Sequence, residues 1–510
     1  MLRRRLYLIG LCFILTACSR PWTEAFLPTP TSYRTPEQVT AKPTQVVVPT
    51  ISYIQPIPRA SGVPAQLPTP DAPHYQAGAP RKEQSYVVQS GDTLGEIAQR
   101  YSISVNQLAQ ANKLSNPNSL EVGQLLTIPV VTPQPNGPAM KIIPDSELVY
   151  GPLSASLDIA GFIQSNGGFL AGFSQDVDGV TMNAAQVVQL IAEDYSVNPR
   201  LLLAVLEYRS GWVTNPNPDP GLGETPFGYI DNWYVGLYRQ LAWAAIQFNS
   251  GFYRWQADAV TDWVLSDGSV VPIDPTINAG TAGVQNFFAQ LDDYPSWLKD
   301  ISADGFAATY SRLFGSPFDL AIEPLIPADL VQPTLLLPFG PGETWSFTGG
   351  PHLAWDAGTP FGALDFAPPG EGQGCVESDA WVTAIADGLV TRTGIGVVIL
   401  DLDGDGNEGS GWVVVYMHIE NRDRVTPGTY LHAGDRVGHP SCEGGVATGT
   451  HVHLARKFNG VWVAADGPVP FNLSGWVASG TGEEYVGSLR RAGIVVENYG
   501  GNSTVNKIQR

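Results

Sequence analysis

The distribution of histidine constrains the fold of this chain more than any other feature of its sequence. Six of the seven histidines lie between His352 and His453, in a chain of 510 residues. Four of them form a candidate site with one carboxylate: His352, Asp365, His418, His451 and His453. Imidazole and carboxylate groups suit Zn²⁺, and a catalytic zinc site has three protein ligands and an open position for water. The fold must therefore bring side chains that are distant in the sequence to one point.

The residues around these side chains are typical of β-strands. His451 and His453 are two residues apart, so in a strand both imidazoles point to the same face. His418 belongs to the β-branched and aromatic segment 412–419, which predicts a second strand. Asp365 is flanked by apolar residues and precedes a Pro-Pro-Gly turn. We therefore expect all of these side chains on or beside strands.

The two other histidines of this stretch have a simpler interpretation. A single histidine in a β-rich domain is more often a hydrogen-bonded surface or core residue than a metal ligand, and we expect this of His432 and His439. The same interpretation is weaker for the five candidate residues, because unrelated roles rarely reproduce the spacing of one site.

Short motifs in this region resemble the LytM or lysostaphin-type zinc endopeptidases, which are peptidoglycan hydrolases. The motifs are Gly349–His352, Ala363–Phe366, Tyr416–His418, Cys442–Gly445 and Thr448–His453. The resemblance is closest to the β-lytic and staphylolysin branch, in which the first ligand precedes the aspartate by thirteen residues, as His352 precedes Asp365. The commoner branch has a histidine four residues before the aspartate, where this chain has Phe361. The resemblance covers about residues 335–480.

The resemblance implies a role for each of the five residues. His352, Asp365 and His453 would bind zinc, and His418 and His451 would be the catalytic pair beside it. Zinc lowers the pKa of a bound water to about 7 and polarises the scissile carbonyl. One imidazole of the pair would move the proton to the leaving amine while the other stabilises the oxyanion, and the sequence does not tell which. The family usually continues its His-x-His with Phe-Glu, whereas this chain has Leu-Ala, a change that affects packing more than ligation.

The first residues predict export. Three arginines and the apolar stretch 6–15 are typical of a secretory signal over residues 1–17, and ten apolar residues are too few to span a bilayer. The quartet Leu15–Cys18 resembles a bacterial lipobox, which implies a lipid on Cys18; the alternative is an ordinary signal with an incidental cysteine. We therefore expect a protein anchored on the outer side of a bacterial membrane, and whether this is the inner or the outer membrane stays open.

The charge of the chain argues against one class of partner. The formal net charge is −20, and loss of three arginines with the signal would make it −23 (−20 − 3). So acidic a protein has no general electrostatic attraction to nucleic acid or to anionic lipid.

Two cysteines remain after removal of the signal and lipidation. Cys12 leaves with the signal, and Cys375 and Cys442 both lie in the candidate catalytic region of an exported protein. This context predicts a disulfide between them, with two free thiols as the alternative. The related branch also carries a comparable cysteine beside its His-x-His strand.

Two segments separate the signal from the rest of the chain. Residues 18–84 are rich in Pro and Thr without apolar periodicity, which predicts a semi-extended linker. Residues 85–130 resemble a LysM module, a βααβ fold that binds glycans containing N-acetylglucosamine. The resemblance implies these glycan-binding positions: Gly91, Asp92, Thr93, Leu94, Asn116 and Pro117.

The middle region, residues 145–330, has the apolar spacing of helices in segments 184–195, 199–206, 241–248 and 284–291. It faintly resembles lytic transglycosylases of lysozyme-like fold, which place their acidic glutamate directly before a serine. Here Arg209 stands at that position, and its permanently charged guanidinium cannot donate a proton to a leaving oxygen. Glu207, two residues earlier, is turned about 200° round the helix.

The aromatic residues of the middle region allow two interpretations. In the first they hold glycan, through Trp212, Trp233, Tyr234 and Trp243. In the second, which we favour, they fill a helical core.

The last region, residues 335–480, has many short strands with Gly and Pro turns, which predicts an antiparallel β-fold. The family resemblance implies an architecture of the duplicated hybrid motif type. The loop 401–408 has the composition of a Ca²⁺ loop, but Trp412 stands where a bidentate glutamate is needed, so we expect an acidic hairpin tip. We expect residues 481–510 to be a peripheral extension. The whole chain is thus predicted to be a multidomain α+β protein.

Two classes of function follow from the resemblance. The first is an exported zinc endopeptidase that hydrolyses peptide bonds in peptidoglycan cross-links or stems. The second is a non-catalytic LytM-type regulator that activates a cell-wall amidase during division; such regulators lack metal ligands, whereas all five positions are present here. A scaffold with a structural zinc is a third reading, although structural sites usually have four protein ligands.

Overall fold

The computed structural model describes residues 84–89, 92–101, 103–114, 116, 120–129, 136–370 and 374–510. The expected signal, the lipidation site at Cys18 and the linker up to residue 83 lie outside the described residues. Within the described ranges, the structure contains no helix with the length and apolar character needed to span a membrane.

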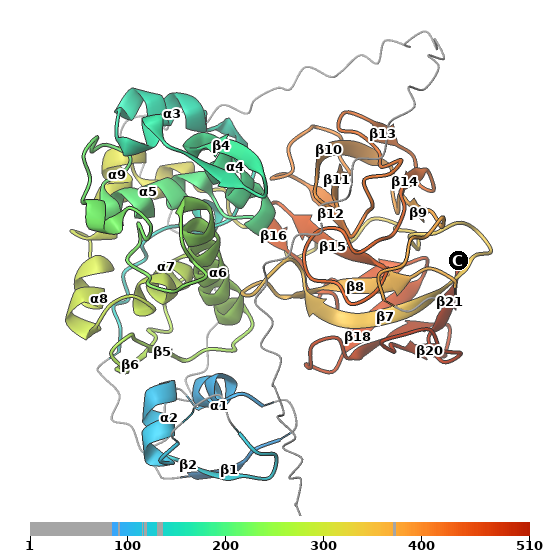
Figure 1. The fold of residues 1–510 in the computed structure, drawn as a ribbon, viewed down its shortest axis with the longest axis horizontal. Helices are drawn as coiled ribbons and strands as arrows, with labels where there is room; N and C mark the ends of the chain where they lie inside the picture. The colour runs from blue at the N-terminus through green and yellow to red at the C-terminus, as the bar shows by residue number, and fades with distance from the viewer. Residues whose placement is uncertain are drawn as a thin grey trace, which may run out of the picture. The chain divides into compact units, whose positions relative to one another are not determined.

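The first described unit has the order strand, helix, helix, strand, as expected for a LysM module (Figure 1). Its elements are β1 Gln84–Val87, α1 Leu94–Arg100, α2 Val105–Ala111 and β2 Leu125–Ile128. β1 and β2 pair in antiparallel orientation. Both helices begin with a capping box, in which Thr93 pairs with Glu96 and Ser104 with Gln107, so two backbone N–H groups at the start of each helix are satisfied by side chains.

The middle region is mainly helical. Its helices are α3 Ile159–Asn166, α4 Ala184–Tyr195, α5 Pro199–Ser210, α6 Leu237–Gln256, α7 Ala279–Ala289, α8 Tyr294–Asp300 and α9 Phe306–Phe314. Short 3₁₀ turns are η1 Asp145–Glu147, η2 Ser154–Ser156, η3 Phe169–Gly172, η4 Pro220–Leu222 and η5 Pro317–Leu320. Two hairpins are formed by β3 Ser174–Val177 with β4 Val180–Asn183 and by β5 Asp262–Val264 with β6 Val270–Pro272. The four helical segments expected from apolar spacing all lie in or overlap α4, α5, α6 and α7, which confirms the pattern.

The last region is built of antiparallel strands. The strands are β7 Thr344–Leu353, β8 Phe361–Ala367, β9 Val382–Thr383, β10 Gly388–Gly394, β11 Val397–Asp401, β12 Trp412–Met417, β13 Tyr430–Leu431, β14 Arg436–Gly438, β15 Val452–Phe458, β16 Val461–Trp462, β17 Asn472–Leu473, β18 Trp476–Gly480, β19 Gly487–Arg491, β20 Ile494–Glu497 and β21 Lys507–Gln509. The main sheet has the order β13-β10-β11-β12-β15-β8-β7-β21, with β16 paired to β15. Smaller sheets are β17-β18-β19-β20 and β14-β9. Figure 1 shows β12, β15, β8 and β7 running side by side.

Residues 481–510 are not peripheral, contrary to our expectation. β19 and β20 complete the four-stranded sheet, and β21 pairs with β7 along Lys507–Gln509. These strands are short and follow Gly-rich turns, so their sequence alone does not indicate which sheet they join.

The main sheet is buried on both faces. Along β12, Val414 and Tyr416 belong to the core inside the β-region, whereas Val413 and Val415 belong to a core that also contains residues of the middle region. Strand residues alternate between faces, so His453, two residues before Ala455, lies on the same face as Ala455 and its partner Val415.

Candidate metal centre

Three adjacent strands position the expected ligands. His453 on β15 is the direct antiparallel partner of Asp365 on β8. His352 is near the end of β7, next to β8, where the pairing of the two strands has register shifts around Gly349 and His352. Such irregularities re-aim side chains near functional sites. Strand pairing therefore brings together three residues that the sequence separates widely.

The donor atoms of these residues converge. His352 Nε2 lies 3.0 Å from His453 Nδ1 and 3.3 Å from Asp365 Oδ1, and His453 Nδ1 lies 3.5 Å from Asp365 Oδ1. Donors bound to one tetrahedral zinc at about 2.0–2.2 Å are roughly 3.4 Å apart. The separations in this structure therefore match a shared ion.

The hydrogen bonds of the two imidazoles leave the facing nitrogens without protons. His352 Nδ1–H donates to the carbonyl oxygen of Gly350 at 2.8 Å, and His453 Nε2–H donates to that of Ala354 at 3.1 Å. In the neutral ring, the opposite nitrogen then carries a lone pair, which is the tautomer that a metal requires.

The carboxylate of Asp365 also indicates that a cation binds here. Its Oδ1 is buried and has no hydrogen-bond partner, an expensive arrangement for a carboxylate oxygen unless a cation compensates it. Burial raises the pKa of Asp365, but His352 and His451 outweigh it and hold this pKa well below its usual value. Burial lowers the pKa of His352, yet Asp365 leaves it raised. Two lone pairs and an unsatisfied carboxylate oxygen thus fit Zn²⁺.

The second pair of histidines lies beside this centre. The ring centroids of His418 and His451 are 4.4 Å apart, and His451 Nε2 lies 3.7 Å from Asp365 Oδ1. His418 Nδ1–H donates to Glu443 O at 3.0 Å, and His451 Nδ1–H donates to Gly449 O at 2.7 Å. Both rings therefore keep Nε2 available. Burial, with His451 and His453 nearby, lowers the pKa of His418 to about 4.

The backbone at His418 is held in an uncommon conformation. Its φ is +61°, in the left-handed region, directly after the last residue of β12. For a non-glycine residue this conformation costs roughly 1–2 kcal/mol, and it persists only when surrounding contacts enforce it. This turn takes the chain out of the strand at the point where the imidazole is needed.

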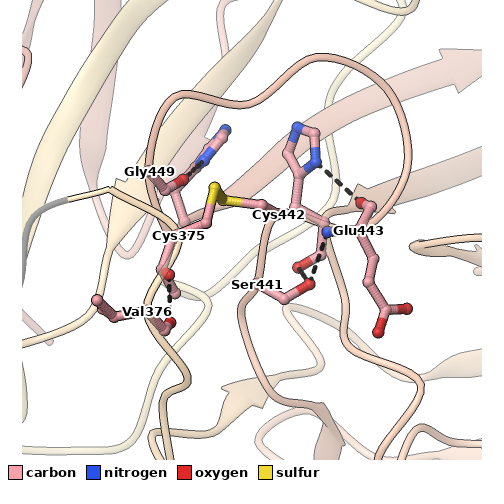
Figure 2. Close-up of a disulfide and its surroundings, with 9 residues drawn as sticks. Cys375, Val376, Ser441, Cys442, Glu443 and Gly449 are labelled. Carbon is pink, nitrogen blue, oxygen red and sulfur yellow. Dashed lines mark hydrogen bonds between the residues drawn. A yellow bond between two sulfur atoms is a disulfide. The ribbon is translucent and has the colours of Figure 1, made fainter. Parts of the chain in front are cut away.

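A disulfide lies next to the histidine pair. Cys375 and Cys442 are bonded, with their Cα atoms 5.7 Å apart, which confirms the expected pairing. Figure 2 shows it between the segments that contain Val376 and Gly449 on one side and Ser441 and Glu443 on the other.

One residue at the site was not anticipated from the sequence. Tyr485 stacks on His352, with ring centroids 4.3 Å apart and an interplanar angle of 18°. It precedes β19, its N–H donates to Pro351 O at 3.0 Å, and its side chain is about half exposed. Burial, followed by Asp365 and Glu484, raises its pKa. No motif marks this tyrosine, because it reaches the site only through the packing of residues 481–486 on β7.

The two other histidines among the described residues lie away from the site, as expected. His432 is exposed and lies 3.6 Å from an oxygen of Asp387. His439 is buried, its Nδ1–H donates to Ala380 O at 2.8 Å, and its ring packs on Trp381. Neither shares the five-residue site.

Comparison with known proteins gives matches over most of the described chain. The family model "LysM domain" matches residues 86–129, and the model "LasA, N-terminal domain" matches residues 141–327. Protease LasA of Pseudomonas aeruginosa is 24% identical over 296 residues, which are 54% of this chain and 66% of LasA. The chain therefore spans just under two thirds of the length of that relative.

A second relative matches the β-region. The β-lytic metalloendopeptidase of Achromobacter lyticus is 30% identical over 165 residues, which are 30% of this chain and 41% of the relative. The chain is a LysM-containing relative of the M23-type metallopeptidases. Among solved structures, the M23 metalloprotease pseudoalterin is 24% identical, with a TM-score of 0.30, and the match covers 35% of this chain and 99% of that one.

The candidate glycan-binding residues of the LysM domain differ in how accessible they are to a ligand. Asp92 accepts hydrogen bonds from Tyr86 Oη and Gln89 N, both at 2.7 Å, and Thr93 caps α1. The side chain of Leu94 is in the core, so it is not available to a ligand. Asn116 is exposed. Gly91 and Pro117 lie outside the described residues.

The region similar to the LasA N-terminal domain has no free catalytic acid at the transglycosylase-like position. Glu207 accepts hydrogen bonds from Val213 N at 3.1 Å and from Thr214 N at 3.0 Å, and Arg312 Nη2 lies 3.0 Å from its Oε1. Arg209 is paired with Asp292 at 3.0 Å. Both residues are structural, in agreement with the sequence argument.

The aromatic residues of this domain divide into two groups. Trp212 and Trp243 are in the core, where Trp212 packs on Phe169 and Trp243 on Tyr229. A glycan-binding role is therefore wrong for both. Trp233 is more than half exposed, and the guanidinium of Arg239 lies 4.1 Å from its ring centroid; Tyr234 is half-buried.

The acidic loop is a hairpin tip between β11 and β12, as expected. Donor atoms of Asp401, Asp403 and Asp405 lie within 4.8 Å of one another. The carboxylate of Asp401 already accepts Asp403 N–H and Gly406 N–H from its own loop. These internal hydrogen bonds account for the loop conformation.

Proposed function

We propose that the protein is an exported zinc endopeptidase that hydrolyses peptide bonds in the cross-links or stems of peptidoglycan. The observation that carries this proposal is the convergence of His352 Nε2, Asp365 Oδ1 and His453 Nδ1 within 3.0–3.5 Å, with the facing nitrogens unprotonated. Protease LasA, the β-lytic metalloendopeptidase and the LysM match support the assignment to a cell-wall peptidase.

The three ligands would hold the zinc, and zinc would supply Lewis acidity to the scissile carbonyl and acidity to the attacking water. His418 and His451 then do the proton chemistry at Nε2. One ring, neutral and unprotonated at Nε2, accepts the proton of the water and returns it to the leaving amine. The other ring must carry a proton on Nε2 as well as on Nδ1 to donate a hydrogen bond to the developing oxyanion. The low pKa of His418 keeps its ring neutral near pH 7, with a lone pair on Nε2.

The hydroxyl of Tyr485 is a further hydrogen-bond donor at the border of the site. Its ring covers His352, and its raised pKa keeps the phenol protonated in the neutral range. We propose that it donates to the carbonyl oxygen of the substrate. In this role Tyr485 would act together with His418 and His451.

The same proposal includes a lipid anchor and the folds of the metallopeptidase region and the middle domain. A lipid on Cys18 would hold the enzyme at the membrane, and the LysM domain would bind wall glycan through Asp92, Thr93 and Asn116. A metallopeptidase sheet of the duplicated hybrid motif type and a lysozyme-like middle domain are the architectures that we propose. Mass spectrometry of the mature amino terminus tests the lipid directly.

Digestion of purified peptidoglycan by the full chain tests the activity. Metal content is measured first, and fragments are then identified by mass spectrometry. New amino termini in stem or bridge peptides support an endopeptidase, and their composition identifies the scissile bond. Intact peptides in the presence of stoichiometric zinc would instead favour a regulator that activates an amidase.

A further inference from the structure

The disulfide Cys375–Cys442 joins two loops that together hold the histidine pair. It links residues 67 apart in sequence, neither of which lies in a strand. The three candidate metal ligands, in contrast, lie on or directly beside strands of the main sheet. The ligands are therefore fixed by strand pairing, whereas the histidine pair depends on the loops for its orientation.

On the Cys442 side, the neighbouring residues bind His418 through both its backbone and its ring. Ser441 N–H donates to His418 O at 2.7 Å, and Ser441 Oγ–H donates to the same oxygen at 3.1 Å. Glu443 O accepts His418 Nδ1–H, and Glu443 N–H donates to Ser441 Oγ at 3.0 Å. The residues before and after Cys442, labelled in Figure 2, thus set the direction in which His418 Nε2 points.

On the Cys375 side, the neighbouring residues bind the segment that leads into His451. Thr450 N–H donates to Gly374 O at 3.0 Å, and Thr450 Oγ1–H donates to Val376 O. Thr450 lies between Gly449, whose carbonyl orients His451 Nδ1–H, and His451 itself. The residues on each side of Cys375 therefore fix the acceptor of the second imidazole.

The loop between these attachments has a high intrinsic freedom. Gly444 and Gly445 both have positive φ, +71° and +62°, and Val446 is largely exposed. Loops of this kind sample many conformations unless they are tied. The disulfide attaches one end of this loop to the segment around Cys375, which binds the other end at Thr450 through hydrogen bonds, and this removes much of that freedom. One S–S bond thus constrains the carbonyl acceptors of both rings.

We propose that Cys375–Cys442 is the positioning element of the catalytic histidine pair: it fixes the carbonyl acceptors that aim Nε2 of His418 and His451, while metal binding does not depend on it. This inference rests on the proposed function for its effect on catalysis. The effect on the tautomers of the two rings is independent of the proposed function, because tautomers are measured without any substrate.

The test uses the full chain with ¹⁵N-labelled histidine and compares the wild type with Cys375→Ala/Cys442→Ala. We expect both proteins to bind one equivalent of zinc. In the wild type, the ring signals of His418 and His451 should show one fixed Nδ1–H tautomer each. In the double variant, these two rings should exchange between tautomers, while the signals of His352 and His453 stay unchanged. Fixed tautomers for His418 and His451 in the zinc-loaded double variant would overturn the proposal.

A second variant keeps the test decisive if the cysteine variant does not fold. Ser441→Ala/Thr450→Val keeps the disulfide but removes the three side-chain hydrogen bonds that link the cysteine segments to the histidines, and should mobilise the same two rings to a smaller degree. Val446→Ala, in the same loop but exposed, is the matched control and should change nothing. Unchanged ring signals in the Ser441/Thr450 variant would also contradict the proposal.

Kinetics on a soluble peptidoglycan fragment then separate this inference from the proposed function. We expect the cysteine variant to lose up to about 10²-fold in kcat, the order of loss known for small misplacements of catalytic groups, with KM within about twofold of the wild type. An inactive wild type with fixed ring tautomers would reject the endopeptidase and leave the positioning role standing. An active double variant with wild-type kcat would reject the positioning role and leave the endopeptidase standing.

Discussion

The ring of Tyr485 stacks on the imidazole of His352, with their centroids 4.3 Å apart. The two residues lie far apart in the sequence and meet because the turn before β19 packs on the end of β7, where Gly350 N–H donates to Tyr485 O at 3.1 Å. A candidate metal ligand is thus covered by the ring of a tyrosine.

Replacing Tyr485 separates its two contributions. Tyr485→Phe keeps the stacked ring and loses the hydroxyl, so we expect unchanged zinc affinity and a loss of about 10²–10³-fold in kcat, as for removal of an oxyanion donor. Tyr485→Ala also exposes His352 and should weaken zinc binding. Metal titration and steady-state kinetics check both variants. Wild-type kcat in the phenylalanine variant would limit Tyr485 to a structural role.

The five-residue site predicts two classes of variant. His453→Ala and Asp365→Ala each remove a converging donor and should lose stoichiometric zinc. His418→Ala and His451→Ala leave the three donors in place and should keep zinc but lose hydrolysis. Elemental analysis and peptidoglycan digestion of the four proteins distinguish the classes. Activity at the wild-type level in His451→Ala would remove that imidazole from the mechanism.

Arg392 predicts a stability effect away from the site. Its Nη1 lies 2.6 Å from Asp194 Oδ1 and its Nε lies 3.0 Å from Glu408 Oε1, while Glu408 also accepts from the buried Lys457. Arg392→Met leaves these partly buried carboxylates with too few cations, so we expect a loss of about 3 kcal/mol. Thermal unfolding should show a clearly lower Tm.

The control for this variant is Arg422→Met. Arg422 pairs with Asp379, which is almost fully exposed, and exposed ion pairs contribute little to stability. We expect its Tm to equal that of the wild type. Equal Tm values for Arg392→Met and the wild type would show that the buried pairs add no net stability.

Asp401 predicts a pH dependence of stability. Burial, then Asp403 and Asp405 nearby, raise its pKa to about 7. Because the pKa in the folded protein is above that in the unfolded chain, the folded state gains from protonation of Asp401 at low pH and loses this gain as the pH rises through about 7. Relative to Asp401→Asn, the wild type should therefore lose Tm between pH about 4, the ordinary pKa of an aspartate, and pH about 7. The exposed Asp304→Asn should follow the wild type, and parallel curves for all three proteins would refute the shift.

The sequence by itself determined the local parts of this protein. Alternation placed His451 and His453 on one strand face, apolar spacing located α4 and α5, and the expectation of export together with two remaining cysteines indicated the disulfide. These features depend on neighbouring residues or on composition, which a single sequence contains. The candidate ligands were recognisable for the same reason, because their motifs are short and contiguous.

Only the tertiary structure decided what depends on contacts between distant segments. The pairing of Asp365 with His453, the unsatisfied Oδ1 of Asp365 and the position of Tyr485 all follow from strand register and loop packing. Burial likewise decided that Trp212 belongs to the core while Trp233 is exposed. Register and burial are set by the competition of all segments for the same faces, so no local pattern of residues could specify them.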